Sequence, residues 1–146
     1  MKVAGRWRYV YRAIDQFGQV IDVFVSQRRD TAAAHRFFER AIGTTRVTPR
    51  GHNRPGSGIS RVLDDLLPAT WQRTDQYPNN RIECDHGRPK ARLRPMRGLK
   101  QDRSATVVLA GHALVRNLRR GHDELAIEEP ASLRVATAFD ELALAI

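Results

Sequence analysis

Cysteine is almost absent from this sequence of 146 residues, in which Cys84 is the only one. A single cysteine cannot form a disulfide within the chain, and no pair of cysteines with the spacing of a zinc site is present. Long apolar runs are also missing, although a membrane-spanning helix needs about 20 mostly apolar residues in a row. The sequence shows no secretory signal. We therefore expect a cytoplasmic protein with no membrane partner.

Acidic residues are few relative to basic ones: 16 Asp and Glu stand against 25 Lys and Arg, for a formal net charge of +9. Only three of the basic residues are Lys. The guanidinium of Arg binds phosphate with a two-pronged set of donors, although a GC-rich genome would also raise the Arg content. The excess favours a polyanionic partner such as nucleic acid. The length and the 41% hydrophobic content predict one soluble domain.

The first 26 residues predict an antiparallel hairpin. Residues 6–14 alternate in the way that a half-buried strand does, residues 15–18 predict a turn, and residues 20–26 predict the second strand. One side of the first strand carries Trp7, Tyr9 and Tyr11, and the other side carries Arg6, Arg8 and Arg12. We expect the basic side to be a solvated face.

Two helices are predicted in the next part of the chain. Asp30 is a good N-cap for a packing helix that stops at Gly43, and we expect His35 within it to be an ordinary interface histidine. A short amphipathic helix is predicted over residues 62–67, where Pro68 stops it.

The C-terminal part predicts a long core helix and a short one. Ser104 is the expected N-cap of a helix over residues 105–120, and Gly121 is its C-terminal stop. The tail, residues 121–146, has six acidic residues, and residues 132–146 can form a short apolar helix. We interpret this tail as a packing appendage, with masking of a basic groove as the alternative. The apolar positions of the long helix are Val107, Val108, Ala110, Leu114, Val115 and Leu118.

The stretch from residue 79 to residue 90 carries the clearest candidate site. A strand over residues 71–77 leads into it, and Asn80 is a good N-cap for a helix. Glu83, His86 and Lys90 then lie on one helix face, and an acid beside a cation suits a divalent metal next to a phosphate. A first-turn Glu is also favoured simply because it complements the helix dipole.

Basic residues are concentrated around this stretch. Residues 81–103 hold eight basic residues against three acids, which makes the segment the strongest phosphate-binding candidate in the chain. A metal site formed by Cys84, Asp85 and His86 is a weaker alternative. Adjacent helical residues point about 100° apart and cannot converge on one ion without further ligands.

Residues 79–88, Lys90 and the run from Arg94 to Lys100 resemble the third catalytic block of DDE transposases from the insertion-sequence family numbered six. The resemblance extends from about residue 2 to residue 146. It implies an α/β, ribonuclease H-like fold, with a mixed sheet flanked by helices. It also implies three carboxylates that hold two Mg²⁺ or Mn²⁺ ions, in enzymes that cut and join DNA at transposon ends and targets.

The resemblance assigns roles by position. Glu83 matches the third acid and is the implied catalytic residue and metal ligand, and Lys90 matches a basic residue that is expected to contact DNA. The implied DNA-binding residues are Arg88, Lys90, Arg92, Arg94, Arg97 and Lys100. A protein of this kind is expected to associate with the nucleoid.

The sequence departs from the family pattern at the other two acids. The first precedes a strand that matches Met1-Lys2-Val3, so the domain is expected to be truncated at its N-terminus. The second belongs to a Thr-Asp-Gln-like block in a central strand, but no acid occurs between Glu39 and Asp64. Suitable codons for residues 52–60, shifted by one base, encode such a block, which indicates a local frameshift.

Three further positions bear on activity. Pro89 stands where the family has Leu, and a proline inside a helix costs about 3 kcal/mol or more. Asp64 and Asp65 are expected to be solvated and not to replace the missing acid.

Two hypotheses follow from these observations. In the first, residues 1–146 are a DDE catalytic domain with a disrupted segment at 44–61 and an appendage at 121–146. With two of three metal-binding acids missing, we expect this domain to be an inactive remnant with weak or absent metal binding. In the second, the chain is a non-enzymatic basic module that binds DNA or RNA. The sequence leaves open whether the chain forms a homodimer.

Overall fold

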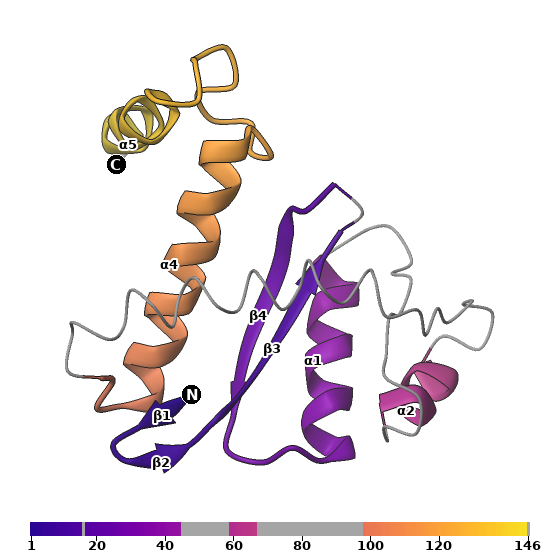
Figure 1. The fold of residues 1–146 in the computed structure, drawn as a ribbon. Helices are drawn as coiled ribbons and strands as arrows, with labels where there is room; N and C mark the ends of the chain where they lie inside the picture. Colours follow the sequence, from indigo (N-terminus) through magenta and orange to yellow (C-terminus); the bar gives the residue numbers. More distant parts are fainter. Residues whose placement is uncertain (16, 45–58, 67–97, 146) are drawn as a thin grey trace.

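The computed structural model describes residues 1–15, 17–44, 59–66 and 98–145, which form an α/β arrangement (Figure 1). The α/β class predicted from the sequence is therefore confirmed. The described strands form two antiparallel pairs, and Val3 also makes a parallel bridge to Leu99. In chain order the elements are β1 (Lys2–Val3), β2 (Arg6–Trp7), β3 (Tyr9–Ile14), β4 (Val20–Ser26), α1 (Thr31–Thr44), α2 (Ile59–Leu66), α4 (Asp102–Arg120) and α5 (Arg134–Leu144).

The hairpin formed by β3 and β4 is the centre of the described fold. It pairs residues 9–14 with residues 20–26, with one irregularity in register near its turn. The Asp15 carboxylate closes the turn by accepting hydrogen bonds from the backbone N–H groups of Phe17 (2.9 Å) and Gln19 (2.8 Å). The predicted hairpin is confirmed, including the bounds of the second strand. Its first strand begins at Tyr9 and not at residue 6, because Arg6 and Trp7 pair with β1 instead.

Each face of this hairpin is covered by a helix. On one face, Tyr11 contacts Phe37 of α1, with ring centroids 5.5 Å apart. The hairpin is therefore a middle layer between α1 and α4 (Figure 1). The cluster on the α4 face consists of Val20, Val23, Leu109 and Ala113, with Val10, Ile14 and Val25 packed beside them.

The prediction that the basic side of the first strand is solvated holds for Arg6 but is wrong for Arg12. Arg12 is buried, with 7% of its surface exposed, whereas Trp7 on the opposite side is 66% exposed. The reason is that Val10 and Ile14 share the strand face of Arg12. Packing these apolar side chains against α4 brings the arginine into the interior with them.

Helix α4 begins earlier than predicted and buries a different stripe. It begins at Asp102, after Gln101 as the N-cap residue, so Ser104 is not the cap. Val107 is 63% exposed and Leu114 is 38% exposed, which contradicts their assignment to the core. Four of the five buried residues follow a spacing of four, and two of the five are alanines. The five are Ala105, Leu109, Ala113, Asn117 and Leu118.

Helix α1 has the predicted cap but a later end. The Asp30 carboxylate accepts a hydrogen bond from the N–H of Ala33 at 2.8 Å, which confirms it as the N-cap. The helix continues through Gly43 to Thr44, because a glycine weakens a helix without necessarily ending it. His35 is partly exposed and lies 3.3 Å from the Glu39 carboxylate, one turn away.

Helix α2 packs against α1 and begins three residues before the predicted start. Val62 and Leu63 are its buried residues, while Asp64 and Asp65 are exposed as predicted. The predicted strand over residues 71–77 and the predicted helix around Glu83 lie outside the described residues.

Helix α5 packs on the C-terminal end of α4, where Leu118, Ala126 and Ala138 form a buried cluster. This placement agrees with a packing role for the tail. Among the described residues, no helix combines the length and the apolar character needed to cross a bilayer.

Candidate nucleic-acid interface

Lys100 is the member of the predicted site that the structure describes. It is exposed and directly follows Leu99, whose carbonyl oxygen accepts a hydrogen bond from the N–H of Ala4 at 2.7 Å. Lys100 is therefore held beside β1. The other predicted site residues, Glu83, Arg88, Lys90, Arg92, Arg94 and Arg97, lie outside the described residues, and their roles stay predictions.

Strands β1 and β2 form a small hairpin next to Lys100. Its two turn residues, Ala4 and Gly5, have φ angles of 47° and 76°. Two positive φ angles are typical of the tight turns that connect hairpin strands, and Gly accepts this conformation without strain. The pairing places Lys2 opposite Trp7.

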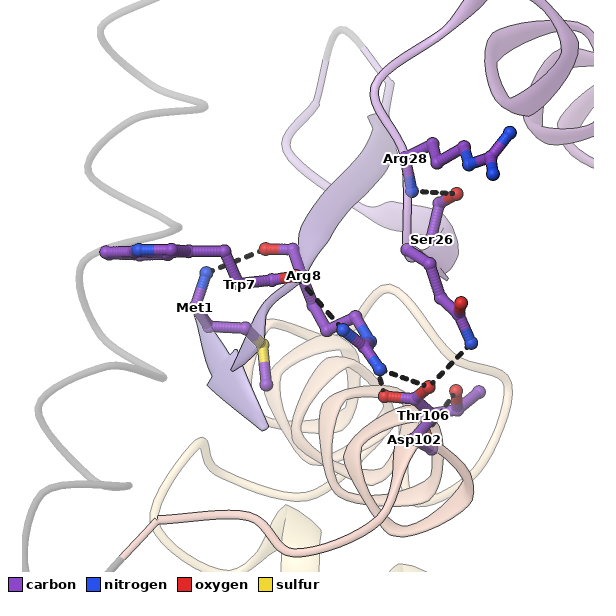
Figure 2. A network of polar contacts seen from close by, with 8 residues as sticks. Met1, Trp7, Arg8, Ser26, Arg28, Asp102 and Thr106 are labelled. Carbon is purple, nitrogen blue, oxygen red and sulfur yellow. Dashed lines mark hydrogen bonds and ion pairs between the residues drawn. The ribbon is translucent and has the colours of Figure 1, made fainter. Parts of the chain in front are cut away.

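An ion pair joins this small hairpin to the start of α4 (Figure 2). Arg8 donates from Nε to Asp102 Oδ1 at 2.7 Å and from Nη2 to Asp102 Oδ2 at 3.0 Å. Gln27 adds a longer hydrogen bond of 3.3 Å to the same carboxylate. Such a two-pronged pair fixes geometry better than a single contact does.

The hydrogen bond from Arg8 is the main reason why the pKa of Asp102 lies below its ordinary value, and the charge of Arg8 acts in the same direction. Asp102 lies in the first turn of α4, where a carboxylate also complements the helix dipole. Arg8 is tied to Met1 as well, through backbone hydrogen bonds of 2.7 Å and 2.9 Å in opposite directions. The small hairpin is thus fixed to the helix at several points.

We call the exposed part of this region the β1–β2 surface, defined as Lys2, Arg6, Trp7, Lys100 and Arg103, all of which are exposed. The ammonium of Lys2 lies 5.3 Å from the centroid of the Trp7 ring, within the range of a cation–π contact. The adjacent carboxylate of Asp102 is neutralised by Arg8. The surface is therefore positive, which suits a polyanion.

A second group of guanidiniums lies between β3 and the C-terminal half of α4. Burial lowers the pKa of Arg12. Burial also lowers the pKa of Arg116, with smaller contributions from the charges of Arg120 and Arg12. Arg120 donates to the carbonyl oxygen of Gly18 at 3.0 Å. Because these arginines serve packing and turn contacts, they are less suited to a partner than the β1–β2 surface is.

The described acids do not gather into a metal site. Within residues 1–15, 17–44, 59–66 and 98–145 no group of three or more His, Cys, Asp or Glu side chains could hold a metal ion. Asp15 is committed to the hairpin turn, and Asp22 pairs with Arg40 at 3.0 Å. The described residues therefore do not fit the two-metal site of the family.

The contributions of Lys2 and Trp7 to this surface were missed from the sequence. Trp7 continues the alternation of Tyr9 and Tyr11, which predicts a common buried side. The sequence feature that could have predicted the small hairpin is the pair Ala4-Gly5 just before Arg6, which is typical of a tight turn.

Comparison with protein families gives a match to a model described as a DDE domain, of the IS240 transposase type, over residues 1–122. Comparison with solved structures gives no match.

Similar curated proteins include transposases of Staphylococcus aureus. The transposase for insertion sequence-like element IS431mec of strain Mu50 is 30% identical over 108 residues, which cover 63% of this chain and 43% of that protein. The transposase for insertion sequence element IS257 in transposon Tn4003 shows the same values. An uncharacterized protein of Yersinia pseudotuberculosis, pYV0051, is 29% identical over 72 residues, which cover 44% of this chain and 67% of that protein. The chain thus spans less than half the length of the transposases that it matches.

Proposed function

Because the chain belongs to the DDE domain family of insertion-sequence transposases, we propose that it derives from the catalytic domain of a transposase and binds DNA. The match of the DDE domain model to residues 1–122 carries this proposal. The positive β1–β2 surface supports it, since phosphate contacts supply most non-specific affinity for DNA.

We further propose a ribonuclease H-like arrangement for this domain. The main hairpin between two helices and the parallel bridge of Val3 to Leu99 are consistent with a larger mixed sheet. Residues 44–61 would then be the disrupted central segment and residues 121–146 the appendage, in keeping with the packing of α5 on α4.

None of the described residues is proposed as a ligand for the metal ions that the family uses. When bound, two divalent ions in such a domain activate the attacking oxygen and stabilise the leaving oxygen at a DNA phosphate. We propose Glu83 as one ligand, by its position in the resemblance. Because the expected position of the second ligand carries no acid, the site provides few of the oxygen ligands that Mg²⁺ requires, and binding should be weak.

We propose that the chain as written does not cut or join DNA. The main support for this proposal is that no acid occurs between Glu39 and Asp64, where the second ligand is expected. The test is a nicking and strand-transfer assay of the purified chain on terminal-repeat DNA with Mg²⁺ or Mn²⁺. We expect no product, and product that disappears in Glu83→Gln would contradict the proposal.

A repaired chain is the matched positive control for that assay. It carries a Thr-Asp-Gln block within residues 52–60, Pro89→Leu and an upstream Asp-containing strand. We expect activity to return if loss of ligands is the cause. Failure of the repaired chain on the correct substrate would mean that the placement of the active site is wrong.

DNA binding itself is tested by the salt dependence of affinity for duplex DNA. Log affinity should fall by roughly 0.9 per phosphate contact for each log unit of salt. Neutralising Arg92, Arg94 and Arg97 together should flatten this dependence. An unchanged slope would exclude these three residues from the binding face.

A non-enzymatic basic module is the second candidate function, and the same missing acid favours it. The two candidates differ in metal binding, because only a transposase remnant predicts a divalent-ion site at Glu83. Titration calorimetry with Mn²⁺ on the chain and on Glu83→Gln separates them. A difference between the two proteins supports the remnant.

Self-association is a separate prediction. A homodimer should show a concentration-dependent mass in analytical ultracentrifugation. A constant monomer mass would exclude it.

A further inference from the structure

We propose that Trp7, with Lys2 opposite it, forms a site on the β1–β2 hairpin where an unpaired DNA base stacks. This inference rests on the proposed function, because it specifies one way in which a DNA-binding protein of this family contacts its DNA. It adds a contact with a base to the phosphate contacts already argued.

The indole of Trp7 is the feature that requires an explanation. It is 66% exposed, although tryptophan is usually largely buried in folded proteins. Among the described contacts of the ring is the Lys2 ammonium, 5.3 Å from its centroid. A flat aromatic surface with a cation beside it can accept a nucleobase on its face and the neighbouring phosphate on the cation.

The site is held in place before any ligand arrives. Trp7 precedes Arg8, whose guanidinium binds both carboxylate oxygens of Asp102 and also donates to the Trp7 carbonyl oxygen at 3.2 Å. Lys2 is fixed opposite Trp7 by strand pairing. Figure 2 shows the indole projecting from this anchored backbone, away from the Arg8–Asp102 pair. A fixed side chain loses less conformational entropy on binding than a mobile one does.

The surrounding positive charge indicates an anionic partner, and the exposed Trp7 ring indicates that this partner has a planar group. Lys2, Arg6, Lys100 and Arg103 are exposed, and the nearby carboxylate of Asp102 is paired. A paired base inside a duplex has both faces covered by its neighbours in the stack, so it cannot lie on the indole. An unpaired base at a DNA end or in a single strand presents a face, and stacking on aromatic rings is the usual way in which proteins hold such bases.

The experiment uses tryptophan fluorescence, because the chain has two tryptophans, Trp7 and Trp71. In a Trp71→Phe background Trp7 is the single reporter. The probes are a blunt DNA duplex and the same duplex with a 3′ overhang of about four thymines, a length within the range of single-strand sites. We expect the overhang DNA to quench Trp7 fluorescence and the blunt duplex to leave it nearly unchanged.

Affinity measurements give the second readout. Because stacking of one base on an aromatic side chain is worth roughly 5- to 150-fold in affinity, Trp7→Ala should weaken overhang binding within that range. Its affinity for the blunt duplex should fall by much less, and Trp7→Phe should keep much of the overhang preference. Phe17→Ala is the matched control, since Phe17 is also an exposed aromatic residue, 72% exposed, in the turn of the main hairpin. It should change neither affinity.

The outcomes separate this inference from the proposed function. Equal quenching by both probes, or an equal loss of affinity for both in Trp7→Ala, would overturn the stacking site while leaving DNA binding intact. Lack of binding to either probe by the unchanged protein would contradict the proposed function as well.

Discussion

The two ends of helix α4 are attached to the β-strands by different chemistry. At the C-terminal end, the buried side chain of Asn117 accepts from the N–H of Val20 and donates to its carbonyl oxygen, both at 2.9 Å. At the N-terminal end, the partly exposed pair of Arg8 and Asp102 makes the attachment. The first end uses neutral, buried contacts, and the second uses charged contacts next to solvent.

This difference indicates that the C-terminal end of α4 mainly stabilises the fold, whereas its N-terminal end borders an exposed surface. The side-chain amide of Asn117 makes the two backbone hydrogen bonds with Val20 that a neighbouring strand would otherwise make. In the protein interior, a backbone group left unpaired costs free energy. The cluster around Leu118 covers the same end. The N-terminal end leaves Lys100 and Arg103 exposed. At the other end, the exposed Arg119 and Arg120 are followed by a tail with six acidic residues, so the N-terminal end has the larger excess of positive charge.

The largest effect is expected for Asn117→Leu, which keeps the size of the side chain but removes both hydrogen bonds. Leaving the N–H and carbonyl of Val20 unpaired should cost roughly 2–5 kcal/mol of unfolding free energy. Urea denaturation measures it. Arg120→Gln, which loses an exposed bond to Gly18 at the same helix end, should change stability by no more than about 0.5 kcal/mol. Similar destabilisation in both variants would contradict a special role for the amide.

A smaller effect is expected for Gly121→Ala at the C-terminal cap of α4. Gly121 has a φ of 69°, and a Cβ there would lie 2.8 Å from Arg134 Nη1. The substitution should cost about 1 kcal/mol. Gly111→Ala is the opposite control, because its Cβ meets nothing within 4 Å and alanine is the better helix former by about 1 kcal/mol. Thermal unfolding should show the two melting temperatures moving in opposite directions.

Still smaller changes in stability are expected where a substitution relieves backbone strain in a turn near either end of α4. Ala4 and Ala126 both have positive φ angles, 47° and 49°. Ala4→Gly should stabilise the protein by about 0.5 kcal/mol, because glycine adopts this conformation without strain. Ala126→Gly should gain less, since the Ala126 methyl group belongs to the buried cluster around Leu118. A larger gain at Ala126 would mean that this cluster contributes little.

The smallest effect is expected for the ion pair, because partly exposed pairs contribute little. The folded-state pKa of Asp102 is below its ordinary value of 3.8, so its contribution is present above that pH and is lost as the pH falls through the folded value. The stability difference between the protein and Asp102→Asn should therefore shrink as the pH is lowered below about 4. Arg8→Gln should behave alike, and the double variant should add nothing further. An additive double variant would show that the two side chains act independently.

Local signals predicted the parts of the fold that depend on neighbouring residues. The hairpin, the cap at Asp30 and the stop at Gly121 follow from patterns within a few positions. The burial of Arg12 does not, because strand alternation alone cannot say which side a helix from the distant part of the chain will cover. The start of α4 was missed for a similar reason, since the partner of Asp102, Arg8, is 94 positions away.

The residues of the candidate site were likewise predicted only where the signal was local in the sequence. Lys100 was predicted from the basic segment around it and is exposed in the structure. Lys2 and Trp7 were not, because only the small hairpin and the bridge to Leu99 bring them to the same surface. The role of Glu83 stays a prediction that rests on the resemblance.

The salt dependence of duplex DNA binding, compared between two matched triple variants, tests whether the β1–β2 surface faces the DNA. One carries Lys2→Gln, Lys100→Gln and Arg103→Gln at the N-terminal end of α4, and the other carries Arg119→Gln, Arg120→Gln and Arg134→Gln at the C-terminal end. Each removes three positive charges. We expect the first variant to flatten the slope by up to about 0.9 for each phosphate that the protein no longer binds, and the second to leave the slope nearly unchanged. Equal slopes in the two variants, or a larger change in the second, would contradict the assignment of the DNA-facing surface to the β1–β2 end.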